Sequence, residues 1–193
     1  MTTRRADRRV DRTRSALLRA FVGLLLSEDV EKITVAGIVE RANVGRSTFY
    51  THFRSRDDLL KASLLLPSLP LARAVTQDVG PDSLLPLLAH FQQQRRLARA
   101  FTTGSLRQLW VRRLTELIEP DLSALARRLR ARPLLPIALV SVQIAELQIA
   151  LVVQWLASHA PPPPEAVAEA LIALTRAAFV ALLRCQPAGT AQM

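Results

Sequence analysis

Apolar residues recur along most of the chain with the period of an α-helix. The first series starts at about Val10 and continues to Leu25 at intervals of three, four and seven, which places its members on one helix face. Beyond residue 80 the same period predicts helices over residues 82–101, 105–117, 120–131, 134–159 and 165–184. Gly104, Pro120, Pro133 and the run Pro161-Pro162-Pro163-Pro164 punctuate them. The pattern therefore predicts an all-α protein.

Two short helices are predicted between residues 34 and 51. Thr34 is suited to cap the first, because its hydroxyl can accept a hydrogen bond from a free amide of the next turn. Asn43 tolerates the left-handed conformation of a sharp turn, and a second helix follows from Gly45. Each helix is too short to be stable alone. Their lengths and spacing indicate a helix-turn-helix supported by the preceding helix and by one beginning near Arg56.

Two prolines, Pro67 and Pro70, are expected to break the helix that begins near Arg56. We therefore predict two domains. Residues 1–61 form a helix-turn-helix domain with three helices, and residues 62–193 form a second helical domain.

The charge supports a polyanionic partner without naming it. The 193 residues hold 26 Lys+Arg and 16 Asp+Glu, a formal net charge of +10. The net positive charge per residue is highest in residues 1–61. The arginine-rich stretch Arg4–Arg14 can be a frayed, solvated terminus or an arm that lies along DNA. The arginine pairs beyond residue 61 fit a solvated helix face.

Several classes of site are disfavoured. Cys185 is the one cysteine, so an intramolecular disulfide and a cysteine zinc site are excluded, and we expect this thiol to be inert rather than a redox sensor. The three histidines are too scattered to suggest a metal. Neither a nucleophile–base pair nor a Gly-rich loop is found, so we expect no enzyme activity and no cofactor.

A membrane location is also disfavoured. Residues 137–159 are apolar enough to span a bilayer, but Glu146 would lie near the centre of the span, where a charge is costly. We expect a buried helix of a soluble, cytoplasmic protein with no membrane partner.

Residues 33–60 resemble the DNA-binding signature of the TetR family of transcriptional regulators. The matching features are an opening threonine, a tight turn, an aromatic recognition helix and a charged pair before two leucines. In this chain they are Thr34, Ala42-Asn43-Val44, Phe49-Tyr50-Thr51-His52-Phe53 and Asp57-Asp58-Leu59-Leu60. Two positions depart from the family pattern: Asn43 replaces the usual turn glycine, and Gly45 replaces a frequent serine. Because glycine has no side chain, Gly45 can contact DNA only through its backbone amide.

The candidate DNA contacts are the polar side chains left over once Ile38, Val44, Phe49 and Phe53 are assigned to packing. We expect Arg46, Ser47 and Thr51 to reach base edges, with Arg46 suited to a bidentate contact with guanine. Thr48, Tyr50 and His52 are expected to touch phosphates. The resemblance implies backbone contacts from Thr34, Tyr50 and Arg56, with Lys61 as a further candidate.

The resemblance implies that residues 1–61 are the DNA-binding domain and that residues 62–193 are a helical regulatory and dimerisation domain. It also implies a homodimer formed through the last two helices, residues 137–158 and 165–184. The dimer would bind an inverted-repeat operator in double-stranded DNA, usually as a repressor, and be released by a small-molecule or protein effector. Residues 92–110 are weakly similar to a subgroup related to the regulator of dihydroxyacetone utilisation. The alternative is a helical dimerisation or adaptor module that responds to a protein partner.

Candidate effector-pocket residues are the polar or aromatic ones within apolar helices, although core packing explains each of them as well. They are His90, Phe91, Phe101, Trp110, Gln143, Glu146 and Trp155.

Overall fold

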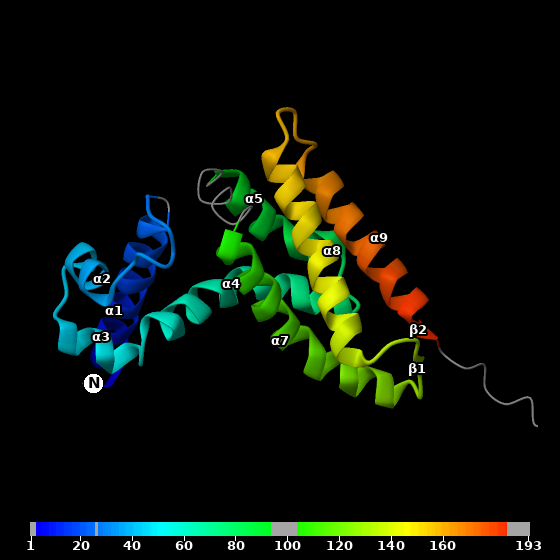
Figure 1. Cartoon of the computed structure of the whole chain (residues 1–193), viewed down its shortest axis with the longest axis horizontal. Coiled ribbons are helices and arrows are strands. Elements are labelled where there is room, and N and C mark those ends of the chain that lie inside the picture. The colour runs from blue at the N-terminus through cyan, green and yellow to red at the C-terminus, as the bar shows by residue number, and fades with distance from the viewer. Residues whose placement is uncertain (1–2, 26, 94–103, 185–193) are drawn as a thin grey trace, which may run out of the picture. The chain divides into compact units, whose positions relative to one another are not determined.

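The computed structural model describes residues 3–25, 27–93 and 104–184, and it is all-α, as the apolar period predicts. The first helices are α1 (Thr3–Leu24), α2 (Val35–Ala42), α3 (Arg46–His52) and α4 (Arg56–Thr76). They are followed by the 3₁₀ turn η1 (Pro81–Leu84) and by α5 (Leu85–Gln93), α7 (Gly104–Arg128), α8 (Ile137–Ala157) and α9 (Pro164–Leu182) (Figure 1). Two-residue strands, β1 (Arg132–Pro133) and β2 (Leu183–Arg184), pair antiparallel.

The chain divides into two compact units, Met1–Leu66 and Pro67–Met193. The first has a core of apolar side chains from its four helical segments, among them Leu17, Phe21, Ile38, Phe49 and Leu59, all fully buried. α2 packs against both α1 and α3. Packing of this kind provides the stability that two short helices lack on their own.

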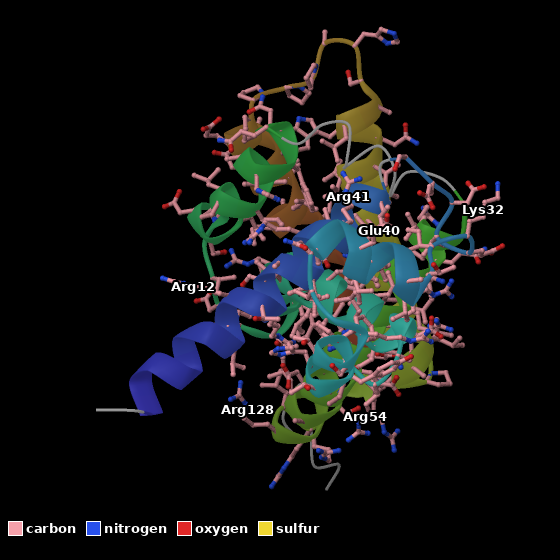
Figure 2. The ribbon with its side chains drawn as sticks, turned by 90° about the vertical axis from the view of Figure 1, so that its left-hand side faces the viewer. Arg12, Lys32, Glu40, Arg41, Arg54 and Arg128 are labelled. Atoms are coloured by element: carbon pink, nitrogen blue, oxygen red, sulfur yellow. The ribbon has the colours of Figure 1, made fainter. Side chains whose placement is uncertain are left out.

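One close approach in the first unit depends on a glycine. A Cβ added to Gly23 of α1 would stand 2.9 Å from both Nε and Nη2 of Arg41 on α2. The absence of a side chain at Gly23 therefore lets the Arg41 guanidinium lie against α1 (Figure 2).

In the second unit α8 lies between α7 and α9, and α5 packs against α9 (Figure 1). One side of α8 is buried, including Val140, Ile144, Ile149 and Trp155. Other apolar side chains remain exposed in this single chain, with Leu139 51%, Leu174 44% and Val180 69% exposed.

Several expected boundaries were wrong. α4 continues through Pro67 and Pro70 to Thr76, and α7 continues through Pro120, because packing can hold a helix together across a missing N–H. α1 begins at Thr3 rather than near Val10, so the Arg4–Arg14 stretch belongs to a helix and is not a frayed terminus. Pro86 lies in the first turn of α5, where its missing N–H has no helical partner to lose. Of the helix expected over residues 82–101, residues 94–101 lie outside the described residues.

Two helices, α4 and α8, are long and apolar enough to cross a membrane by length and composition alone. Core helices of soluble proteins pass the same test, and 44% of the apolar stretch of each helix is buried inside the protein. Because α8 packs between two other helices, we interpret it as part of the core of the second unit.

Candidate nucleic-acid interface

α2 begins and ends at the two residues that its sequence predicts. The Thr34 hydroxyl accepts a hydrogen bond from the amide of Gly37 at 3.2 Å and so caps the helix. Asn43 ends the helix in the left-handed conformation, with φ 52° and ψ 50°. The amide of Val44 then donates to the carbonyl of Val39 at 3.0 Å, which closes the turn. Both predictions are confirmed.

α3 follows after a glycine cap. Gly45 has an extended backbone and supplies no side-chain bond to the first turn, so the amides at the start of α3 are left without a side-chain cap. Phe49 and Phe53 are 0% and 2% exposed, and their ring centroids lie 5.9 Å apart. These aromatic side chains fix one face of α3 in the core of the first unit and leave the opposite face free.

The free face of α3 consists of polar side chains. Arg46, Ser47, Tyr50 and Thr51 are exposed, whereas Thr48 and His52 are half-buried. The Tyr50 ring rests edge-on against Phe49 at 5.3 Å, which limits where its hydroxyl can lie. The Thr51 hydroxyl donates to the carbonyl of Ser47 at 3.1 Å, so only its acceptor capacity remains for a ligand. One arginine and several hydroxyls on one exposed helix face are suited to base edges and phosphates.

Arg56, predicted as a phosphate contact, forms hydrogen bonds within its own unit. Its Nη1 donates to the carbonyls of Val30, Glu31 and Ile33 at 3.1, 3.2 and 3.3 Å, and its Nε and Nη2 bond Asp57. The guanidinium therefore closes the loop between α1 and α2. This role could not be inferred from local sequence, because the carbonyls lie more than twenty residues away along the chain.

The sequence did not single out two other exposed cations, Arg14 and Arg54, as neighbours of α3. The Arg14 guanidinium lies 4.8 Å from the centre of the Phe53 ring, a cation–π arrangement that ties α1 to the end of α3. Arg54, labelled in Figure 2, lies two residues beyond the end of α3, and its amide donates to Asp58 Oδ2 at 3.1 Å. Lys61, predicted as a contact, is exposed on α4.

In the loop before α2, Lys32 and Asp29 form an exposed ion pair at 2.9 Å. The hydrogen bond and charge of Asp29 raise the pKa of Lys32, which therefore stays charged.

The effector-pocket candidates are dispersed. Phe91 packs against Trp110 at 5.6 Å, and Trp155 donates through Nε1 to the carbonyl of Pro162 at 2.9 Å. His90 is exposed, and Phe101 lies outside the described residues.

Gln143 and Glu146 line an open apolar trough of about 640 Å³ between α8 and α9. Glu146 is also ion-paired with Arg107. Among the described residues, the structure thus brings His90, Phe91 and Trp110 together in one group and Gln143 and Glu146 together in another. Two fully buried polar residues of the same unit, Gln148 and Thr175, were not among the predicted pocket residues.

Comparisons with known proteins agree with this geometry. Residues 17–63 match the family model of bacterial regulatory proteins, tetR family. The chain is 41% identical to the uncharacterized HTH-type transcriptional regulator YxbF of Bacillus subtilis (strain 168) over 59 residues, which are 30% of its length. That match covers only 16% of the length of YxbF.

Among solved structures, the chain resembles a TetR transcriptional regulator from Streptococcus agalactiae 2603V at 26% identity. The TM-score is 0.57, and the match covers 88% of this chain and 97% of that one. A TetR-family regulator from Syntrophomonas wolfei shares the fold at 16% identity and the same TM-score, covering 90% of this chain and 98% of that one. The helix-turn-helix signature, the all-α fold and these relatives agree that residues 17–63 are a helix-turn-helix of the TetR type and that the chain shares the fold of a TetR transcriptional regulator.

Proposed function

We propose that this protein is a cytoplasmic transcriptional repressor that binds an inverted-repeat operator as a homodimer and is released by an effector. The proposal rests on the exposed polar face of α3. Phe49 and Phe53 pack the opposite side of this helix into the core of the first unit. In this proposal Arg46, Ser47 and Thr51 contact base edges. Thr34, Thr48, Tyr50, His52 and Lys61 contact the DNA backbone, and Gly45 does so through its amide.

The dimer is proposed to form through residues 137–158 and 165–184. Support comes from the apolar side chains exposed on α8 and α9 and from the trough between these helices, lined by Leu135, Leu139 and Leu182 among others. A second copy of the chain would remove this apolar surface from water, which is the dominant driving force for stable association. Gln143 and Glu146 would then face the partner subunit, where their polar groups can form hydrogen bonds.

Sedimentation tests the dimer directly. We expect a dimer at micromolar concentration for the native chain and a monomer after introducing Leu174→Glu together with Ala178→Glu, because buried unpaired carboxylates oppose association. Glu substitution at the exposed Ala124 of α7 provides a control away from α8 and α9. A native monomer, or a dimer unaffected by the double change, would contradict this part of the proposal.

Selection from random double-stranded DNA tests the operator. A two-fold dimer presents two copies of α3, so the selected sites should be inverted repeats. Because α3 offers few base-reading side chains, we expect only about three to five specified positions in each half-site. Affinity should fall steeply with salt, since bound arginines displace counterions from DNA. Failure to retain any double-stranded DNA at low salt would favour the alternative, a helical adaptor module that responds to a protein partner.

A further inference from the structure

Arginines gather at one end of the second unit, where α7 ends and β1 pairs with β2 (Figure 1). We call four exposed residues here, Arg127, Arg128, Arg130 and Arg132, the arginine cluster; Arg128 is labelled in Figure 2. The sequence has no Asp or Glu from residue 122 to residue 145. Within the described part of the chain, no ion pair neutralises the cluster. The result is a concentrated positive charge on an exposed surface.

Arg130 stands where an arginine lowers local stability. Its φ is 50°, the left-handed conformation in which glycine usually ends a helix. The amide of Ala131 donates to the carbonyl of Ala126 at 3.0 Å, which closes the end of α7 around this residue. A side chain is strained in this conformation, because its Cβ crowds the backbone. Glycine would therefore end α7 at less cost, and the stability of the helix does not explain the arginine.

Arg132 is also placed unfavourably. The register of the two-residue ribbon sets Arg132 of β1 opposite Arg184 of β2, and like charges on opposing residues repel. Arg127 and Arg128 alone have a simple explanation, because cations are favoured at the last turn of a helix. Departures from local rules are expected where a residue serves a partner. The cluster as a whole therefore points to an anionic partner.

Exposed leucines lie between the arginines and directly after them. Leu129 is 43% exposed and Leu134 is 50% exposed, and neither lines the trough between α8 and α9. The phosphates of a nucleic acid make no use of such apolar side chains. A protein segment that carries both carboxylates and apolar side chains matches both features, because arginine forms bidentate pairs with carboxylates and leucine is covered by apolar groups.

We propose that the arginine cluster, with Leu129 and Leu134, docks an acidic amphipathic segment of a partner protein. Carboxylates of the segment pair with the guanidinium groups, and its apolar side chains cover the two leucines. This docking surface includes none of the residues assigned above to DNA contacts or to the dimer. The inference therefore goes beyond the proposed function and does not rest on it.

Binding of a synthetic peptide to the full-length protein tests the docking surface. The probe is a helix of about 18 residues, five turns, made of glutamate and leucine with all leucines on one side. In fluorescence anisotropy we expect saturable binding to the native chain. The double variant Arg128→Gln and Arg132→Gln should bind about tenfold more weakly, the combined effect of losing two solvent-exposed ion pairs. Arg73→Gln with Arg112→Gln removes the same charge from exposed positions of the same unit and should bind like the native chain.

The apolar part of the surface has its own controls. Leu129→Ser with Leu134→Ser should weaken binding of the probe several-fold, because apolar surface on the peptide is left uncovered. A peptide of the same composition with its leucines spread around the helix should bind the native chain as weakly. Equal binding of the two peptides would show attraction by charge alone and would overturn the proposal.

Arg130→Gly separates partner binding from stability. Removing the strained side chain should raise the melting temperature by about 2–4 °C, yet it should weaken binding of the probe several-fold. A purely structural role for Arg130 predicts a lower melting temperature and unchanged binding, and that result would overturn its assignment to the docking surface.

The remaining outcomes decide the identity of the partner. Absence of probe binding to the native chain, or equal binding by the cluster variant and its control, overturns the proposal. Random-sequence double-stranded DNA is the second ligand to be titrated. If Arg128→Gln with Arg132→Gln loses affinity for this DNA and keeps its affinity for the peptide, the cluster binds nucleic acid and the proposal is overturned. Loss of peptide affinity with unchanged DNA affinity is the result expected.

Discussion

Replacing Arg56 by alanine distinguishes a structural role for this residue from a DNA contact. Nη1 of Arg56 carries two hydrogens, so it can form good hydrogen bonds with two of its three neighbouring carbonyls at a time. The bond to Asp57 is exposed to solvent and therefore adds little to the stability of the fold. A hydrogen bond from a charged donor contributes about 1.5–3 kcal/mol, and solvent reaching the 31% exposed side chain lowers this figure. We therefore expect Arg56→Ala to lower the free energy of unfolding by about 2–3 kcal/mol.

Urea and thermal unfolding of the free protein measure this loss, which corresponds to a fall of roughly 5–10 °C in melting temperature for a chain of this size. Arg54→Ala is the matched control, because Arg54 is an exposed arginine two residues away whose described hydrogen bond is through its backbone. Arg56→Lys should recover only part of the stability, since lysine lacks the planar fork. The reasoning is refuted if Arg56→Ala melts like Arg54→Ala but binds all DNA sequences more weakly with a shallower salt dependence.

Three further predictions concern the helix-turn-helix. Thr34→Ala should cost about 1 kcal/mol of stability in urea unfolding through loss of the α2 cap, and Thr34→Ser should not; equal stability of the two variants would contradict the capping role. Asn43→Val should cost about 1–2 kcal/mol because of its left-handed backbone, whereas Asn43→Gly should unfold at the same urea concentration as the native chain or a higher one. In mobility-shift titrations, Arg46→Ala should lose about 1–3 kcal/mol of discrimination between the selected site and random DNA. Tyr50→Phe should weaken binding to both DNAs alike.

The first unit was predictable because its signals are local. Thr34 and Asn43 act on amides and carbonyls within a few residues, so their roles could be inferred from the sequence and were confirmed. The role of Arg56 could not be inferred in this way, because its carbonyl partners come from a loop distant in sequence.

The second unit was less predictable for the same reason. Pro67, Pro70 and Pro120 are strong local breakers, yet tertiary packing keeps α4 and α7 continuous through them. Gln148 stood in an apolar segment with nothing to show that its amide meets Leu71 and Thr175, which are 77 and 27 residues away. The candidate pocket residues were chosen by type, and residue type does not determine which side chains meet in space.

Footprinting on DNA selected by the native protein most directly tests the claim that the exposed face of α3 reads DNA from a two-fold dimer. We expect two protected half-sites related by symmetry, with centres about one helical turn, or a multiple of it, apart on the same side of the duplex. Arg46→Ala should lose this protection in favour of weak, non-specific binding. A single asymmetric protected site, or full symmetric protection by Arg46→Ala, would contradict the account.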